Sequence, residues 1–302
     1  MGAMKRRLWK ERQIWIIAIP MLVWVLVFCY YPLYGLIIAF QNYVPGHSLL
    51  SGPWVGLDNF IRFFHVPEFK HIIRNTVAIS LLTMLLSLPA PIILAVLFNE
   101  VKSKLFKRSI QTLSYIPYFI SWVVVASIIN TILGSDGIVN DILLRLGLID
   151  RAILFMGEGK YFWGILASAN LWKEVGFSTI IYLSAIAGID GEQYEAGRVD
   201  GLGRFGLIWH ITLPSIRTTI VLLWILGLGN ILNAGFEQQL LLGTPMTQDY
   251  YEVIDTYVYR YGVQLGNYSF GTAVGLMKAI IGIVLVVTVN KISKKTLDTS
   301  IF

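Results

Sequence analysis

Polar side chains interrupt segments that are otherwise hydrophobic, and their spacing indicates contact with a polar solute. Asn230, Asn233 and Glu237 recur at i, i+3 and i+7, which places them on one face if the segment is a helix. Polar groups inside a membrane-spanning helix are costly and usually face a pore or a neighbouring helix. Amide and carboxylate groups supply the donors and acceptors that solute hydroxyl groups require. The stripe predicts a solute pathway, and hydrogen bonding between helices is the competing interpretation.

A second polar group lies in an earlier hydrophobic segment. Lys173 and Glu174 are adjacent, so on a helix they point about 100° apart and cannot simply pair face to face. At least one of them needs another partner. Lys278 is a further cation within a span, and the two lysines would suit an acidic solute. Trp172 could stack on a ring of the solute, although aromatic belts at membrane interfaces are common.

The residues needed for catalysis on this chain do not occur together. The sequence contains no G-x4-G-K-(S/T) phosphate-binding loop, because Gly201 to Gly206 has glycines without the following lysine. The four histidines are dispersed and Cys29 is the single cysteine, so no metal site and no internal disulfide is predicted. We expect no catalytic residues, no bound metal and no cofactor on this chain.

Composition identifies the chain as a membrane protein. Of its 302 residues 56% are hydrophobic and 14% charged, below the usual share of about 25%, and the mean hydropathy is +0.66. This excludes an ordinary soluble enzyme. The net charge of +6 comes from cations beside hydrophobic segments, a pattern that indicates contact with anionic membrane lipid rather than nucleic acid.

Hydrophobic runs long enough to cross a bilayer predict six membrane-spanning helices. We place them at about residues 14–40, 72–98, 109–133, 162–189, 218–242 and 270–289, with prolines kinking several of them. If both termini lie inside, the inner segments hold 15 Lys and Arg residues and the outer loops hold 7. Cytoplasmic segments carry the excess of positive charge. We therefore predict cytoplasmic termini, with a basic segment at 1–13, one domain at 14–295 and a tail at 296–302.

The polar segment 190–217 lies between the fourth and fifth predicted spans, on the cytoplasmic side. Residues 192–199 can form a short helix with Asp190 as its N-cap, and Gly201 and Gly203 permit a sharp reversal. Pro214 fits the first turn of the next helix, where its missing N–H costs little. The apolar residues of this segment could pack on a partner or along the membrane: Phe205, Leu207, Ile208 and Trp209.

The spacing E-A-(A/G)-x3-G-x9-I-x-L-P in this segment resembles the coupling loop of ABC importer permeases. Its positions here are Glu195, Ala196, Gly197, Gly201, Ile211, Leu213 and Pro214. Further stretches resemble sugar-type importers of the MalF-like group, and in particular its LplB-like branch: Arg74-Asn75-Thr76, Pro89-Ala90-Pro91, Ser114-Tyr115-Ile116-Pro117, Trp172-Lys173-Glu174-Val175-Gly176, Asp255-Thr256-Tyr257-Val258-Tyr259-Arg260 and the segment 267–276. The resemblance covers roughly residues 14–295. Gly197 departs from the usual second alanine, which weakens the helix by up to about 1 kcal/mol.

The resemblance implies the type I importer fold, an all-α membrane protein with a cytoplasmic coupling helix between the fourth and fifth spans. The chain would be one half of a two-permease pore in the bacterial inner membrane, with a second permease subunit, two cytoplasmic ATPase subunits that hold ATP and Mg²⁺, and an extracytoplasmic solute-binding protein. Oligosaccharide, with acidic uronate chains as one possibility, would be the cargo. Glu195 would contact the ATPase, Ala196 and Gly197 would allow close approach, and Asp200 and Gly201 would shape the turn.

Two alternatives remain open at this stage. The same architecture could carry another cargo, such as a peptide or a lipid-linked sugar. A six-span membrane enzyme or an ion-driven carrier is a different class, and it would leave the coupling spacing without an explanation.

Overall fold

The structure is a computed structural model that describes residues 12–229 and 231–297. Over these ranges the chain is helical and forms no strand, apart from an isolated bridge between Gln41 and Trp54. The prediction of an all-α fold is confirmed for the described residues. The chain divides into two compact units, one of residues 1–66 and 258–277 and the other of residues 67–257 and 278–302. The predicted basic segment 1–13 lies almost wholly outside the described residues, as does most of the tail 296–302.

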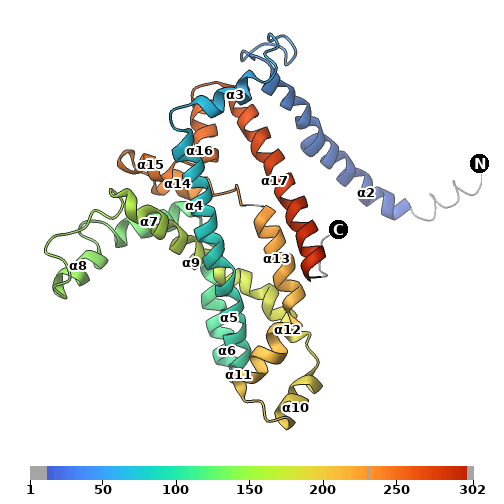
Figure 1. Cartoon of the computed structure of the whole chain (residues 1–302), viewed down its shortest axis with the longest axis vertical. Coiled ribbons are helices and arrows are strands. Elements are labelled where there is room, and N and C mark those ends of the chain that lie inside the picture. Colours follow the sequence, from blue (N-terminus) through green and yellow to red (C-terminus); the bar gives the residue numbers. More distant parts are fainter. Residues whose placement is uncertain (1–11, 230, 298–302) are drawn as a thin grey trace, which may run out of the picture. The chain divides into compact units, whose positions relative to one another are not determined.

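The first unit begins with a continuous helical stretch of 29 residues, Arg12–Phe40. It consists of α2 (Arg12–Val25), a π-helical turn η1 (Leu26–Tyr30) and a 3-10 segment η2 (Tyr31–Phe40) (Figure 1). Pro20 lies inside α2, and Pro32 lies at the start of η2. This stretch confirms the predicted helix at 14–40 and the irregularity that its prolines imply, because proline removes a backbone donor.

Aromatic packing and buried hydrogen bonds hold the first unit together. It also includes α3 (Asp58–His65), η6 (Tyr259–Gln264) and the first part of α17 (Tyr268–Leu297). Phe63 is fully buried and lies 6.3 Å from the Phe270 ring. The amide of Asn59 donates to two main-chain carbonyls where η2 ends. Gly262 and Gly271 pack so closely that a Cβ on Gly271 would lie 2.8 Å from the Gly262 Cα.

The second unit is built around α9 (Gly159–Ala187), which packs against α4 (Phe69–Ser87) and α5 (Pro89–Glu100). The two helices α4 and α5 meet at Leu88, and together they form a 32-residue span. The predicted interruption near Pro89 is therefore confirmed. Two groups of buried apolar residues form the core of this unit: Ile79, Ala126, Phe162, Leu166, Ala234, Leu242 and Val253 in one, and Ala95, Tyr182, Ile186 and Ile216 in the other.

The predicted third span, 109–133, corresponds to two helices joined by a sharp bend. The chain forms α6 (Lys104–Tyr115) and a 3-10 turn η3 (Ile116–Phe119), bends by 101°, and continues as α7 (Trp122–Ile132). Pro117 lies in the 3-10 turn and Ile120 is extended, so the helical ladder stops. Ser121 then caps α7 by accepting a hydrogen bond from the Val124 N–H. Gly176 of α9 packs on the Ser114 carbonyl so closely that a Cβ there would overlap it.

The predicted fifth span, 218–242, is wrong as a continuous helix. The helix α13 (Arg217–Gly229) ends early, and the chain becomes helical again only at α14 (Glu237–Leu242). Gly235 has φ = +98°, a left-handed conformation that ends regular helix and is easiest for glycine. The remaining helices of the second unit are α8 (Ile138–Arg145), α10 (Gly191–Val199), α11 (Arg204–Leu207), the π-helical η4 (Ile208–Thr212), α12 (Leu213–Ser215), η5 (Pro245–Thr247), α15 (Gln248–Tyr251) and α16 (Ile254–Val258).

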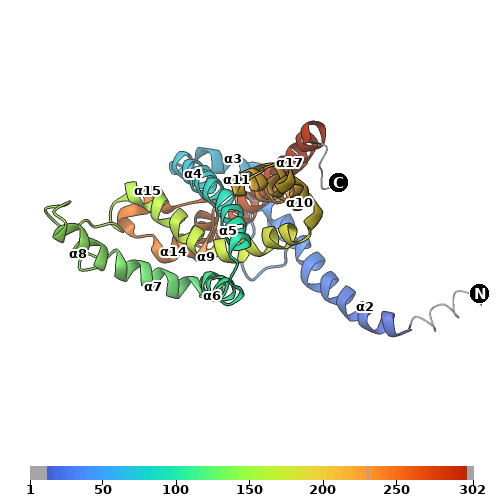
Figure 2. The ribbon, with the colours of Figure 1, turned by 90° about the horizontal axis from the view of Figure 1, so that it is seen from below.

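Three described helical stretches are long and apolar enough to cross a bilayer: Arg12–Phe40, Phe69–Glu100 and Tyr268–Lys295. The bent pairs Lys104–Phe119 with Trp122–Ile132, and Arg204–Ser215 with Arg217–Gly229, raise the number to five if each pair is one span. The predicted fourth span corresponds to α9, which has 29 residues and carries Lys173 and Glu174. Within the second unit, α10 and α11 lie at the end farthest from α15 (Figures 1 and 2).

Candidate functional site

The short helix predicted at residues 192–199 is confirmed as α10, Gly191–Val199. Asp190 is its N-cap, and its carboxylate accepts a hydrogen bond of 3.0 Å from the Glu192 N–H. Glu192 lies in the first turn and Arg198 in the last, which matches the polarity of the helix dipole. These local interactions make α10 a well-defined helix despite its length of nine residues.

The end of α10 is fixed by a glycine-dependent cap. The Leu202 N–H donates to the Gly197 carbonyl at 2.9 Å, and the Gly201 N–H donates to the Arg198 carbonyl at 3.1 Å. This pair of bonds, with Gly201 at φ = +83°, is the Schellman arrangement at a helix C-terminus. The predicted reversal at Gly201 is therefore confirmed, and its geometry explains why a glycine stands there.

Gly197 faces the interior of this segment rather than outward. It is buried, and a Cβ there would lie 2.7 Å from Ile211 Cδ1 and 2.9 Å from Leu207 Cδ2. The expectation that Gly197 presents surface for close approach of a partner is wrong, because its own chain covers it. Ile211 acts as part of that cover. Because Gly197 has no Cβ, Leu207 and Ile211 can pack directly onto α10. This packing compensates for the low helix propensity of glycine.

A hydrogen bond anchors α10 to the helix that follows it. The Tyr194 hydroxyl lies 3.0 Å from the hydroxyl of Thr212, which is buried. Leu213 packs on the core group that includes Ile216, and Pro214 lies in the first turn of α12, as its sequence position predicts. The segment from α10 to α12 is thus one folded element. The sequence reasoning did not identify Tyr194 or Thr212.

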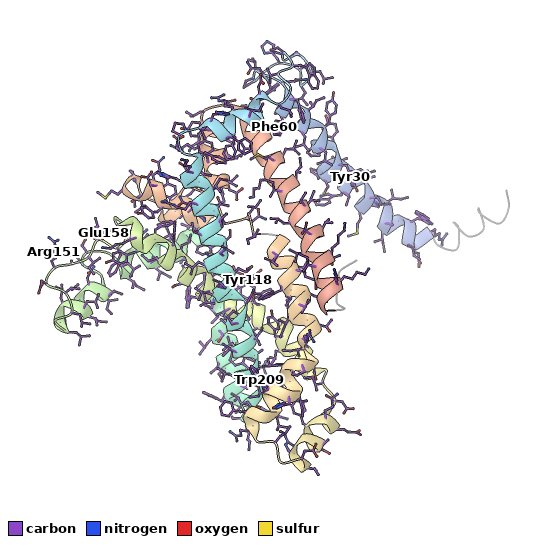
Figure 3. The ribbon with its side chains drawn as sticks, viewed as in Figure 1. Tyr30, Phe60, Tyr118, Arg151, Glu158 and Trp209 are labelled. Atoms are coloured by element: carbon purple, nitrogen blue, oxygen red, sulfur yellow. The ribbon has the colours of Figure 1, made fainter. Side chains whose placement is uncertain are left out.

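The outer surface of this element is polar with exposed apolar side chains. Glu195, Ala196 and Asp200 are exposed. Val199 is 88% exposed and Phe205 is 89% exposed, which is unusual for apolar side chains on a folded element. Of the apolar patch predicted from the sequence, Phe205 and Trp209 are exposed, whereas Leu207 is buried and Ile208 partly buried (Trp209 is labelled in Figure 3).

The predicted stripe of Asn230, Asn233 and Glu237 does not lie on one helix face. Asn230 lies outside the described residues, Asn233 lies in the non-helical stretch after α13, and Glu237 begins α14. The i, i+3, i+7 argument fails because the helix stops at Gly229. Inside a membrane, such irregular backbone is tolerated where it is covered by protein or lines a cavity. Both conditions hold here.

An uncharged polar cavity of about 240 Å³ adjoins this interruption. Its polar lining residues come from α4, α9, the stretch between α13 and α14, and α14 itself: Ser80, Thr83, Ser87, Asn170, Asn233 and Gln238. The Gln238 amide donates to the Asn170 side-chain carbonyl at 3.4 Å. The buried hydroxyls of Ser80 and Thr83 have no hydrogen-bond partner among the described residues. We call this the neutral cavity.

A second cavity, of about 350 Å³, carries charge. Three of its lining residues are Lys173 and Glu174 of α9 and Glu237 of α14. The others come from the bend and from the first residue of α7: Tyr118, Ile120, Ser121 and Trp122. We call it the charged cavity (Tyr118 is labelled in Figure 3). The structure therefore brings Lys173, Glu174 and Glu237 together, and it places Asn233 at the neutral cavity.

The remaining pathway candidates lie elsewhere. Lys278 forms an ion pair with Asp255, with Nζ 2.7 Å from Oδ2, so its charge is already neutralised. Trp172 lines two apolar grooves beside α9, of about 740 and 410 Å³, and neither polar cavity. No group of three or more potential His, Cys, Asp or Glu metal ligands occurs among the described residues.

Arg74, Asn75 and Thr76 form a cluster of polar side chains near the start of α4. The sequence analysis used them only for the family resemblance and assigned them no structural role. Asn75 is fully buried and donates to the main-chain carbonyls of Asp249 and Glu252, at 3.0 and 2.9 Å. Arg74 donates to the same Asp249 carbonyl at 2.6 Å. The Thr76 hydroxyl accepts a hydrogen bond from the Ile254 N–H at 3.1 Å. Three successive side chains thus hold the segment that contains α15.

The fold and this site define the class: a helical integral membrane protein with a folded segment from α10 to α12 and cavities between its helices. Residues 87–297 match the family described as "Binding-protein-dependent transport system inner membrane component", and the chain belongs to this family of ABC transporter permeases.

Similar proteins of known sequence cover almost the whole chain. The chain is 42% identical to Protein LplB of Bacillus subtilis, over 98% of this chain and 91% of that protein. It is 40% identical to the polygalacturonan/rhamnogalacturonan transport system permease protein YteP of the same organism, over 98% of this chain and 92% of that protein.

The fold is also similar to a solved structure. A chain in the crystal structure of a bacterial ABC transporter involved in the import of the acidic polysaccharide alginate aligns with a TM-score of 0.89 and 37% identity, covering 97% of this chain and 99% of that one. A second crystal structure of that transporter holds an alginate pentasaccharide-bound periplasmic protein, with the same TM-score and identity over 98% and 99%. The family and this similarity define the type I permease fold.

Proposed function

We propose that this chain is a pore-forming subunit of an ATP-driven importer that moves oligosaccharides into the cytoplasm. The observation that carries the proposal is the folded segment from α10 to α12, in a chain that belongs to the permease family. The similar proteins support a sugar cargo, since one is a polygalacturonan/rhamnogalacturonan permease and another belongs to an alginate importer. The non-sugar cargoes and the ion-driven carrier have no comparable support.

The coupling role follows from how this segment is held. A lever that transmits force must be rigid and must expose a contact surface. The N-cap at Asp190, the glycine cap at Gly201 and the bond from Tyr194 to Thr212 supply rigidity. Phe205 and Val199 expose apolar surface with Glu195 nearby on α10. A cytoplasmic ATPase subunit with an apolar groove and a hydrogen-bond donor for Glu195 fits this surface.

The other partners complete the proposed assembly. A second permease subunit forms the other half of the pore, two ATPase subunits bind ATP and Mg²⁺, and an extracytoplasmic binding protein delivers cargo. The excess of Lys and Arg in the predicted inner segments supports six spans with cytoplasmic termini. In this arrangement the segment from α10 to α12 is cytoplasmic, and α15 lies toward the outer face, in accord with their positions at opposite ends of the second unit (Figure 1). No cofactor is assigned to this chain.

The cargo pathway in this proposal runs past the interruption between α13 and α14. Broken helices are a common place for solute sites in transporters, because unwound backbone and side-chain groups there can bind a ligand. The neutral and charged cavities both adjoin this interruption and contain uncharged amides, hydroxyls and carboxylates. Sugar hydroxyls pair well with such groups.

The test measures ATP hydrolysis by the complete importer in proteoliposomes, with its binding protein loaded in turn with oligogalacturonides, alginate oligosaccharides, neutral oligosaccharides or peptides. The Glu195→Ala, Gly201→Asp double variant is compared with the unmodified chain. We expect one oligosaccharide class to stimulate hydrolysis, and the variant to lose this stimulation while still assembling with its partners. Equal stimulation in both forms would refute the coupling role. Stimulation by peptides alone would refute the cargo.

A further inference from the structure

The charged cavity has features that bear on which part of a sugar it contacts. We propose that it is a subsite that binds the hydroxyl groups of a sugar and disfavours a carboxylate. An acidic oligosaccharide is then held here through the side of a sugar ring that carries hydroxyl groups and no carboxylate. This inference rests on the proposed oligosaccharide function and concerns one cavity within it. The cavity volume of about 350 Å³ equals that of roughly a dozen waters, and this is enough space for one sugar ring.

Among the described residues, Lys173 is the only cation that lines this cavity, and its ammonium already binds the bend between α6 and α7. Its Nζ donates to the Tyr118 carbonyl at 2.6 Å and lies 3.5 Å from the Pro117 carbonyl. The residue is 6% exposed, and the ammonium lies 5.4 Å from the Tyr118 ring centre and 5.8 Å from the Trp122 ring centre. Carbonyls freed by a 101° bend need donors. Lys173 therefore stabilises the bend and is poorly placed to receive an anion.

The two carboxylates of the cavity have unused acceptor capacity. Glu174 is half-buried and Glu237 is exposed, and neither carboxylate accepts a hydrogen bond from the described residues. An ionised carboxylate only accepts hydrogen bonds, and it can accept several. Two hydroxyls on neighbouring carbons of a sugar can donate to one carboxylate, whereas a uronate carboxylate cannot donate and carries the same charge. The cavity lining carries two acidic groups and one basic group, so its formal charge repels the uronate group.

The neutral cavity gives independent support for a site that binds hydroxyl groups, because a buried hydroxyl in it has no partner among the described residues. Asn170, Lys173 and Glu174 follow i, i+3 and i+4 on α9 and share one face, so the two cavities lie along the same side of that helix. Ser80 is 8% exposed, lines the neutral cavity, and has a hydroxyl without a hydrogen-bond partner among the described residues. Buried hydroxyls normally find a partner. A polar ligand or water in the neutral cavity would satisfy it, and no charged side chain from the described part of the chain lines that cavity.

Both lysines that were predicted to favour an acidic cargo thus already bind groups of this chain. Lys278 pairs with Asp255, and Lys173 holds the bend. If the importer carries uronate chains, the counterions for their carboxylates come from the binding protein or the other permease. This chain then selects through hydroxyl geometry.

The experiment is equilibrium dialysis of two radiolabelled trisaccharides with the purified importer, without its binding protein. One is tri-galacturonate, and the other is its carboxyl-reduced neutral counterpart. The chain is compared with the Glu174→Gln, Glu237→Gln double variant and with the single Glu237→Gln variant, which changes only an exposed side chain. Asp141→Asn is the matched control, because it removes one negative charge from an exposed pair with Arg145, outside both cavities.

We expect the unmodified importer to bind the neutral trisaccharide more tightly. The double variant should reduce this preference about tenfold, the single variant should reduce it in part, and Asp141→Asn should leave it unchanged. An unaltered preference, an equal loss of both affinities, or no measurable binding of either trisaccharide would overturn the subsite. Failure of the proposed function is seen separately, when the unmodified importer with its binding protein takes up no oligosaccharide at all.

Discussion

The ion pair between Lys278 and Asp255 allows a quantitative prediction. The ammonium lies 2.5 and 2.7 Å from the two carboxylate oxygens, and the side chains are 13% and 29% exposed. Removing one partner of a buried pair costs about 3–5 kcal/mol, because the other charge is left uncompensated, whereas apolar replacement of both is often neutral. We use about 3 kcal/mol for Lys278→Met, the lower end, since Asp255 keeps some access to solvent. At about 2–4 °C per kcal/mol for a domain of this size, the melting temperature falls by about 6–12 °C.

Thermal unfolding of the importer in nanodiscs, followed by tryptophan fluorescence, measures this effect. The Lys278→Met, Asp255→Leu double variant should recover most of the lost stability, because no charge is left unpaired. Lys160→Met is the matched control, since it breaks an exposed pair with Glu158 and should change stability by less than about 1 kcal/mol. If Lys278→Met behaves like this control, or if the double variant shows the sum of the single losses, the pair is not the stabilising contact described here. The variant should also leave cargo preference unchanged, because Lys278 lines neither polar cavity.

Three other substitutions test individual contacts. Gly176→Val should prevent α6 from packing on α9, because a Cβ there overlaps the Ser114 carbonyl; we expect loss of the assembled complex on size-exclusion chromatography, with Gly164→Val in open space as the control. Asn75→Ala should cost about 1–3 kcal/mol by removing the buried hydrogen bond to the Glu252 carbonyl, whereas Arg74 still donates to the Asp249 carbonyl, and unchanged thermal stability would contradict this. Gly201→Ala should cost about 1–2 kcal/mol through its left-handed conformation and lower cargo-stimulated ATP hydrolysis, whereas full stimulation would show that the cap is not needed for coupling.

The segment from α10 to α12 was predictable because local interactions determine it. A capping aspartate, a left-handed glycine and a proline in a first turn act within a few residues, so their types and spacing are sufficient. What the sequence did not reveal is which side of α10 is covered. That depends on Ile211 and Leu207, which return to Gly197 only after the chain has reversed. From the sequence, glycine in place of alanine at position 197 was expected only to weaken the helix. In the structure, the absence of a Cβ at Gly197 is required for packing.

The interruption of the fifth helix was not predictable from hydropathy. Residues 218–242 are apolar enough to read as one span, and glycines alone do not show whether a helix bends, breaks or continues. The break becomes stable only because protein surrounds it, with Ala234 buried in the core group around Phe162. The periodicity argument for Asn233 and Glu237 assumed a helix that does not exist. It still selected residues that line the two cavities beside the break, because polar side chains in a span are costly whatever the backbone does.

Position alone does not give the role of a charged residue in a membrane span. The sequence presents Lys173 and Lys278 as equivalent cations, but one holds a bend through carbonyl oxygens and the other neutralises a carboxylate. Both explain how a lysine is tolerated in an apolar environment, since each ammonium is satisfied by the chain itself. The charged groups of the charged cavity that remain available are then Glu174 and Glu237, which the sequence named without distinguishing them from the lysines. In the subsite that we propose, selectivity depends on what Lys173 already binds, and so on the bend at Pro117 as much as on the residues that line the cavity.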